Sequence, residues 1–377
     1  MLAAALLAVW SSLCVGRVHA AEGETVGQAA RTAIAIEALS RLKSVDLEAN
    51  AALKAAVLKV VEQVRGKPQF VELVRDFKIK GQGAALLEIA IKHADNATGV
   101  EALRLVLENQ ESELIKNSLA GTNAGAATKI AEALGNVGEN QIVPLLAPLV
   151  NDPARDVTLR KQAVRALTKN QEGAAALLKL AKEDKLPADV KLVASAELNG
   201  VRWPNLKAEA AQLLPLPQSQ NAEALPPVSE LVKRNGDPIR GAEIFRRETV
   251  GCSKCHQVGT DGINFGPALS EIGTKLAREA IYESILDPSA GISFGFEAFQ
   301  LELKNGDEAY GLIASETADE LALKAQGGII TRYKKSDITK KEQQKLSAMP
   351  AGLQQTMTTQ ELVDLVEYLA TLKKAEP

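Results

Sequence analysis

Two cysteines and a histidine lie close together about two thirds of the way along the chain, in the stretch Cys252-Ser253-Lys254-Cys255-His256. The C-x-x-C-H spacing is typical of c-type haem attachment. Both thiols add across the vinyl groups of a porphyrin, and the imidazole of the next residue binds the iron as its proximal ligand. Two intervening residues place both sulfurs on one edge of the macrocycle, and one further step aims His256 at its centre.

The same cysteine spacing also occurs in zinc half-sites and in dithiol redox pairs. Structural zinc takes four ligands, and the chain has three cysteines and three histidines in all. Cys14 and His19 fall in a segment that reads as a signal peptide, so the remaining candidate ligand is His93, far upstream of the motif. A second C-x-x-C and a surrounding βαβ pattern are both missing, which disfavours zinc and dithiol chemistry.

Composition indicates a helical protein of ordinary charge. The 377 residues suffice for two or three domains. Aromatic residues make up only 3% of the chain while Ala and Leu are abundant, which favours helices packed through small side chains. The net charge of −3 lacks the basic signature of nucleic-acid binding, so no nucleic-acid partner is expected.

Residues 1–20 read as a secretory signal peptide. The apolar run from Leu2 to Trp10 is too short to span a bilayer. Val18-His19-Ala20 offers small residues at the −3 and −1 positions, so cleavage is expected after Ala20. An uncleaved anchor remains an alternative, because no Lys or Arg precedes the apolar run. We expect a periplasmic or otherwise exported mature chain with no transmembrane span, which agrees with haem attachment outside the cytoplasm.

Residues 21–214 are expected to form a helical-repeat domain. Four leucines recur at intervals of 31, 33 and 31 residues: Leu103, Leu134, Leu167 and Leu198. Self-similarity at this period is typical of stacked helical hairpins. The phrase from Asp152 to Leu167 resembles a HEAT repeat, with an irregular all-α domain as the alternative. Residues 215–227 contain four prolines and are expected to form a linker.

Residues 228–374 resemble a class I c-type cytochrome, most closely the haem-binding domain first described as the Pirellula and Verrucomicrobium type. The resemblance rests on four features: Gly241-x-x-x-Phe245, Gly266-Pro267-x-Leu269, Ser347-Ala348-Met349-Pro350-x-Gly352-Leu353, and an amphipathic helix from Thr359 to Leu372. It implies one covalent haem c on Cys252 and Cys255, and a first and last helix that cross at Gly241. It also implies that the Pro267 carbonyl accepts the His256 N–H and so orients the ring.

The sixth iron ligand is expected to be Met349. The mature chain has two methionines, Met349 and Met357, and no histidine beyond His93 and His256. Met349 precedes Pro350 in the loop that resembles the family's distal loop, whereas Met357 is expected to pack the start of the last helix. Ligation by Met357, an open position and ligation by lysine remain alternatives, because methionine is often only a gap-filler.

The remaining feature is an insertion in the otherwise all-α cytochrome domain. Residues of about 294–336 alternate in hydrophobicity between turn residues, which predicts an antiparallel β-meander. Four strands are expected: Phe296–Leu303, Glu308–Ala314, Glu320–Ala325 and Ile329–Tyr333. Three roles for this insertion remain open: it shields the haem, it binds a partner, or it stabilises the domain without a role of its own.

The resemblance implies an electron carrier rather than an enzyme, transferring single electrons through the haem. The helical repeats would dock a redox partner, for example a periplasmic dehydrogenase on a separate chain, and so raise its effective concentration. One alternative is a haem enzyme or a gas or redox sensor with an open distal site, although the sequence offers little distal His or Arg machinery. Another alternative is a haem-bearing scaffold.

Overall fold

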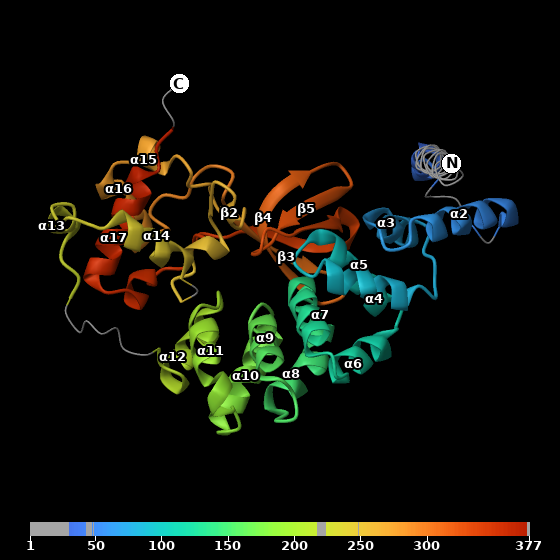
Figure 1. The fold of residues 1–377 in the computed structure, drawn as a ribbon, viewed down its shortest axis with the longest axis horizontal. Coiled ribbons are helices and arrows are strands. Elements are labelled where there is room, and N and C mark those ends of the chain that lie inside the picture. The colour runs from blue at the N-terminus through green and yellow to red at the C-terminus, as the bar shows by residue number, and fades with distance from the viewer. Residues whose placement is uncertain (1–29, 43–46, 48, 217–223, 248, 375–377) are drawn as a thin grey trace, which may run out of the picture. The chain divides into compact units, whose positions relative to one another are not determined.

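The computed structural model describes residues 30–42, 47, 49–216, 224–247 and 249–374 (Figure 1). The expected signal peptide and most of the expected linker lie outside these residues. The chain divides into two compact units, one of residues 1–89 with 104–114 and the other of residues 90–103 with 115–377. None of the described helices combines the length and apolar character that crossing a bilayer requires.

The first unit is helical, with α2 (Ala51–Gln63), α3 (Pro68–Asp76) and most of α4 (Gly83–Lys92). Asn50 caps α2 by accepting a hydrogen bond from the backbone N–H of Leu53. Pro68 occupies the first turn of α3, where its missing N–H costs nothing.

The helices of the run that carries the recurring leucines lie mostly in the second unit. These helices are α5 (Ala97–Glu108), α6 (Ser112–Ala120), α7 (Ala124–Val137), η1 (Asn140–Ile142), α8 (Val143–Asn151), α9 (Val157–Leu167), α10 (Gln171–Lys182), α11 (Ala188–Asn199) and α12 (Pro204–Leu213). Helices α5 and α6 each have part of their length in the first unit. Helix α9 contacts α7 and α11, and α10 contacts α8 and α12, so alternate helices pack in two rows. The predicted helical character is confirmed, while the HEAT-like assignment stays a prediction.

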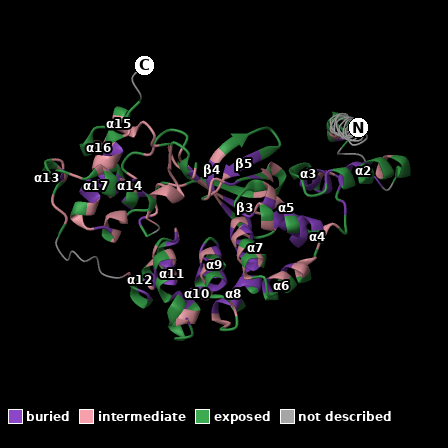
Figure 2. Ribbon diagram, in the orientation of Figure 1, coloured by how far each residue is buried: buried purple, intermediate pink, exposed green. Residues whose placement is uncertain are grey.

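Side chains on alternate helices explain why these rows form. The leucines at positions 103, 134, 167 and 198 lie on α5, α7, α9 and α11, and each is fully buried. Figure 2 shows buried residues along these helices. Asn123, Asp156 and Asn170 begin α7, α9 and α10 with side chains that accept backbone N–H bonds. The sequence therefore encodes both the buried stripe and the helix starts.

The haem motif lies in the last part of the second unit. Its helices are α13 (Val228–Leu231), α14 (Pro238–Arg246), η2 (Cys252–Lys254), α15 (Ile272–Lys275), α16 (Arg278–Leu286), η3 (Lys335–Asp337), η4 (Leu353–Thr356) and α17 (Thr359–Thr371). A two-stranded ladder of β1 (Gln257–Val258) and β2 (Asp261–Gly262) follows the motif. Buried side chains from α13, α14, α16 and α17 share one apolar core.

Helices α14 and α17 cross at a glycine. A Cβ at Gly241 would lie 2.0 Å from the carbonyl oxygen of Asp364 and 2.6 Å from the Cβ of Tyr368. The carboxylate of Asp364, which is buried, accepts the backbone N–H of Asp237 at 2.9 Å, and Asp237 in turn caps α14. The predicted close approach at Gly241 is therefore confirmed, since only glycine permits it.

The insertion is a five-stranded antiparallel sheet rather than a four-stranded meander. Its strands are β3 (Ala298–Leu303), β4 (Glu308–Glu316), β5 (Glu320–Lys324), β6 (Ile330–Lys334) and β7 (Ile338–Gln343), in the order β6-β5-β4-β3-β7. The four predicted strands form. The expectation that the sheet ends near residue 336 is wrong, because β7 returns to pair with β3. This strand reads Ile-Thr-Lys-Lys-Glu-Gln and is exposed at the edge, so it shows no apolar alternation.

The sheet contacts the helical rows within the second unit. The guanidinium of Arg202, in the loop between α11 and α12, lies 4.3 Å from the ring centre of Trp203 and 4.7 Å from that of Tyr310 on β4. The backbone N–H of Asn140 donates to the carboxylate of Asp307 at 2.9 Å. These two contacts join the segments that precede α8 and α12 to the β3–β4 hairpin. Asn140, Arg202 and Tyr310 also line the cavity described next.

Candidate haem site

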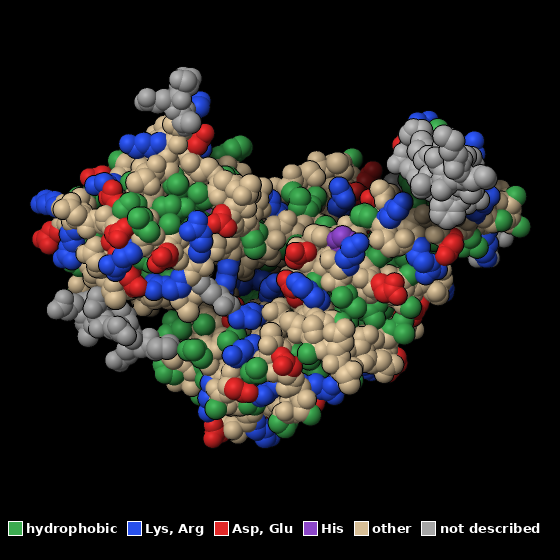
Figure 3. Space-filling model, in the orientation of Figure 1, with side chains coloured by type: hydrophobic (Ala, Val, Ile, Leu, Met, Phe, Trp, Pro, Cys, Tyr) green, Lys and Arg blue, Asp and Glu red, His purple; other side chains and the backbone are tan. Residues whose placement is uncertain are grey.

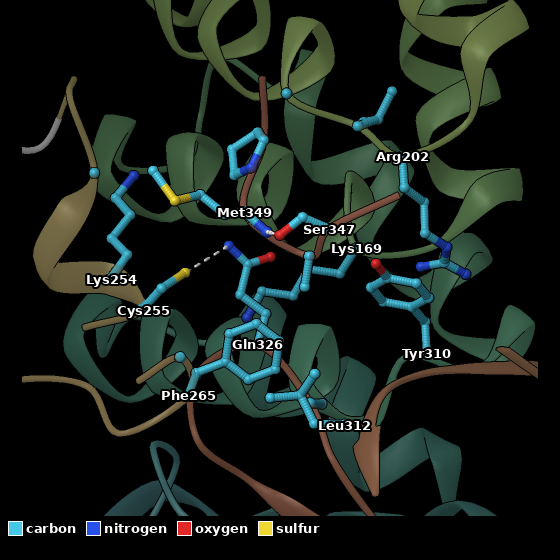
Figure 4. A pocket seen from close by; sticks show the side chains of 18 of the residues that line it. Lys169, Arg202, Lys254, Cys255, Phe265, Tyr310, Leu312, Gln326, Ser347 and Met349 are labelled. Atoms are coloured by element: carbon cyan, nitrogen blue, oxygen red, sulfur yellow. Dashed lines mark hydrogen bonds between the residues drawn. The ribbon is translucent and has the colours of Figure 1, made fainter. Parts of the chain in front are cut away.

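The two cysteines line a large cavity. Gly251 adopts a left-handed conformation with φ of 78° and begins the short helix η2 that carries Cys252. The backbone N–H of His256 donates to the carbonyl of Cys252 at 2.9 Å, which fixes the tight turn through the motif. Cys252, Cys255 and His256 line one cavity of about 1620 Å³, in which Figure 4 shows Cys255. This volume exceeds the roughly 300–1,000 Å³ of a typical small-ligand site.

The environment of the thiols disfavours dithiol and zinc chemistry. Burial raises the pKa of Cys252 and that of Cys255 to about 11 each, so both thiols stay protonated at neutral pH. A redox dithiol reacts as the thiolate, so this burial disfavours dithiol chemistry. Among the described residues, no group of three His, Cys, Asp or Glu side chains is arranged to hold a metal ion. The raised pKa values thus argue against a redox dithiol, and the missing group of ligands argues against zinc.

The imidazole of His256 is held in one tautomer. Its Nδ1 lies 2.8 Å from the carbonyl oxygen of Pro267. A carbonyl oxygen only accepts, so Nδ1 carries the hydrogen and the Nε2 lone pair is free for a metal. Burial lowers the pKa of His256, and this keeps the ring neutral near pH 7. A neutral, oriented imidazole is what an iron ligand requires.

Gly266 packs directly against this ring. A Cβ at that position would lie 2.8 Å from Cε1 and 3.1 Å from Nδ1 of His256. The preceding residue, Phe265, is buried, and its backbone N–H and that of Gly266 both donate to the carbonyl of Cys255. The loop therefore has little freedom to move away from the ring.

Gly266→Ala is expected to displace the imidazole and to weaken its bond to the iron. The purified variant should show a shifted Soret band and a lower haem content than the parent protein, because the ring cannot keep its bond to Pro267. Gly125→Ala, on the first turn of α7, is the matched control, since its Cβ would meet only Asn123 Oδ1 at 3.5 Å. A Gly266→Ala spectrum equal to that of the control would contradict this role for the loop.

Met349 and Met357 occupy different environments. Met349 is half-buried and lines the cavity, where Figure 4 shows its side chain on the same side as Cys255. Its loop is tied down, because the N–H of Met349 donates to Ser347 Oγ and the N–H of Ser347 donates to Ser289 Oγ, both at 3.1 Å. Met357 also borders the cavity but is only 4% exposed and packs in the apolar core.

The residues present fit a covalently bound haem. Two thiols, one oriented imidazole and two thioethers border the same cavity. Its walls include buried apolar side chains such as Phe265, Ile281 and Leu365, which suit the flat body of a porphyrin. Cys252 and Cys255 would attach the group, and His256 would bind the iron, with Met349 or Met357 as a further candidate ligand.

One wall of the cavity was missed by sequence reasoning. Lys169 and Arg202 come from turns of the helical rows, and Tyr310 and Gln326 come from the sheet and its loops. The Gln326 amide lies 3.9 Å from the sulfur of Cys255. No local spacing connects these positions with the motif, because only the tertiary packing brings them together.

Comparison with known proteins supports the haem assignment for this part of the chain. The family model of cytochrome c matches residues 239–373, less than half of the chain. This match supports a c-type cytochrome domain and, with it, covalent haem and electron transfer. A search of curated proteins finds no match. The narrower resemblance to the Pirellula and Verrucomicrobium type stays a prediction.

Proposed function

We propose that this chain is an exported single-electron carrier with one covalent haem c. Bound haem supplies an iron centre that cycles between the ferric and ferrous states. Cys252 and Cys255 would anchor the group, and His256 and Met349 would hold its iron. Two protein ligands held in fixed positions keep the rearrangement between redox states small.

The observation that carries this proposal is the 2.8 Å contact between His256 Nδ1 and the Pro267 carbonyl. It leaves Nε2 directed away from the backbone as a lone-pair donor in a cavity that also holds both thiols and the Met349 side chain. The shared cavity distinguishes this imidazole from a structural histidine, whose N–H would also bond a carbonyl. The cytochrome c match over residues 239–373 supports the same reading.

We further propose that the helical rows form HEAT-like repeats that dock redox partners. The two-row packing of α7 to α12 and the burial of the recurring leucines support this architecture. A redox protein on a separate chain, such as an exported dehydrogenase, is the partner class we propose. Export would depend on residues 1–20 acting as a signal peptide.

A haem enzyme or sensor with an open distal site is the second candidate. One observation favours it: the cavity wall carries the polar side chains of Lys169, Arg202 and Tyr310. The sequence alone predicts few histidine or arginine side chains on the distal side of the haem. Donors of this kind stabilise bound oxygen ligands or peroxide when the iron has an open position.

Carbon monoxide separates the two candidates. The electron carrier is expected to show a reversible one-electron redox titration and a ferrous spectrum that carbon monoxide leaves unchanged, because Met349 occupies the sixth position. Peroxide should oxidise the ferrous protein without catalytic turnover. A carbon monoxide shift of the Soret band in the unmodified protein would contradict the carrier proposal and favour the enzyme or sensor.

A further inference from the structure

Several charges on the β insertion are paired within the insertion itself. Lys340 lies 2.8 Å from the carboxylate of Glu342. Lys335 and Lys341 lie 2.8 Å and 3.0 Å from the carboxylate of Glu316. Figure 3 shows a similar mixture on the face that it draws, where Lys and Arg side chains lie among Asp and Glu. Paired charges of this kind attract a charged partner only weakly, so they do not explain why the insertion is there.

The insertion holds the Met349 loop, residues 344–352, by hydrogen bonds. This loop lies between β7 and η4 and forms no helix or strand in the structure, which describes all of it, so regular backbone pairing cannot fix its position. At its start, the N–H of Gln344 donates to the carbonyl of Ala298 at 2.8 Å. Three residues later, the N–H of Ser347 donates to Ser289 Oγ at 3.1 Å. The loop that leaves the insertion is thus attached at two points to the segment that enters it.

A second serine connects this attachment to Met349 itself. The N–H of Met349 donates to Ser347 Oγ at 3.1 Å, a bond that Figure 4 draws as a dashed line. Ser289 and Ser347 therefore form a chain of hydrogen bonds that ends at the backbone of Met349. A serine hydroxyl accepts a backbone N–H in each of the two bonds. The side chain of Met349 lines the haem cavity directly beyond this backbone position.

The position of Ser289 is fixed by the end of α16. The helix ends at Leu286, because Asp287 precedes a proline and adopts φ of −135° and ψ of 76°. Pro288 is buried, and the N–H of Ala290 donates to the carbonyl of Asp287 at 3.1 Å, which closes a tight turn around Ser289. Helix α16 itself packs into the apolar core of the cytochrome domain. Ser289 therefore holds the Met349 loop from a well-anchored turn.

We propose that Ser289 is a positioning residue for Met349, and that the β insertion serves to hold the loop that carries this iron ligand. The inference rests on the proposed ligation of the iron by Met349. Pairing of β3 with β7 fixes the start of the loop, and Ser289 fixes the part next to the ligand. When the loop opens and the thioether leaves the iron, the N–H of Ser347 loses its acceptor. The hydrogen bond at Ser289 therefore favours the closed loop and the six-coordinate iron.

The test uses ferric, haem-loaded, full-length protein and imidazole as the probe, because imidazole binds the iron only when the thioether leaves it. The shift of the Soret band during titration measures the affinity for imidazole. Ser289→Ala removes the acceptor hydroxyl, and Ser289→Thr keeps one. The control is Thr317→Val, which removes a hydroxyl that accepts the N–H of Glu320 at 3.1 Å in the turn between β4 and β5. Thr317 is exposed and lies outside the residues that line the cavity.

Ser289→Ala is expected to bind imidazole about fivefold more tightly than the parent protein, the factor that corresponds to one lost hydrogen bond of about 1 kcal/mol. Ser289→Thr should restore the parent affinity, and Thr317→Val should keep it. The weak long-wavelength band of the thioether should remain in every variant without imidazole, because Met349 still binds the iron. Denaturation midpoints of Ser289→Ala and Thr317→Val should fall by similar small amounts, so a general loss of stability cannot produce the difference in imidazole affinity.

Equal imidazole affinities of Ser289→Ala and Thr317→Val would overturn the positioning role and leave the electron-carrier proposal intact. A Ser289→Thr protein that binds imidazole as tightly as Ser289→Ala would also overturn it, because the hydroxyl would then have no effect. A parent protein without the thioether band would instead contradict ligation of the iron by a methionine, and with it both proposals.

Discussion

Met349→Ala is expected to open the sixth coordination position of the iron. The weak long-wavelength band that a thioether gives to ferric haem should disappear, and carbon monoxide should bind the ferrous variant. The reduction potential should fall by about 0.1 V or more, since axial ligands move haem potentials over a range of roughly 0.8 V. Absorption spectroscopy with redox titration measures all three changes. The overall fold should persist, because Met349 is only half-buried.

Met357→Ala is the matched control for this experiment. Its side chain is 4% exposed and packs in the core shared by α14, α16 and α17, so truncation should cost about 2–5 kcal/mol of unfolding free energy. Its absorption spectrum should stay that of the parent protein. The opposite pattern, with an unchanged Met349→Ala spectrum and an altered Met357→Ala spectrum, would move the axial ligand to Met357.

Gly241→Ala is expected to destabilise the cytochrome domain strongly. The new Cβ would lie 2.0 Å from the carbonyl oxygen of Asp364, a backbone atom of α17 that cannot rotate away. The two helices must separate, which should cost at least the upper end of the about 1–3 kcal/mol typical of overpacked cores. The helix propensity gained by replacing glycine, about 1 kcal/mol, is too small to compensate.

Chemical denaturation followed by circular dichroism and haem absorption measures this loss. Gly291→Ala is the control, because a Cβ there meets no atom within 4 Å and the residue needs no left-handed backbone. Equal denaturation midpoints for the two variants would show that α14 and α17 do not depend on the contact at Gly241.

The parts of the site that follow one another closely in the chain could be predicted from the sequence. Cys252, Cys255 and His256 need only the local turn of η2 to reach one cavity, and Pro267 lies eleven positions after His256. The sequence favours Met349 over Met357 as the iron ligand, because Met349 precedes a proline in a loop whereas Met357 lies at the start of a helix. Both methionines border the cavity, with Met349 half-buried and Met357 buried in the core, and ligation of the iron by Met349 stays a prediction.

Features that depend on packing between distant segments could not be predicted. Strand β7 pairs with β3 across an intervening run of three strands, and its polar sequence carries no signal of that pairing. Lys169 and Arg202 reach the cavity only because the β3–β4 hairpin contacts the loops of the helical rows. Hydrophobic periodicity indicates which face of a helix or strand is buried. It does not indicate which other element that face packs against.

The mass of the purified, exported protein after acid denaturation is the most direct test of the central claim. We expect one haem to remain attached to the unfolded chain, with Cys252 and Cys255 both protected from alkylation. The alkaline pyridine spectrum should show the band position typical of two thioether bonds. A denatured chain with no haem and two alkylated cysteines in this motif would contradict the electron-carrier account.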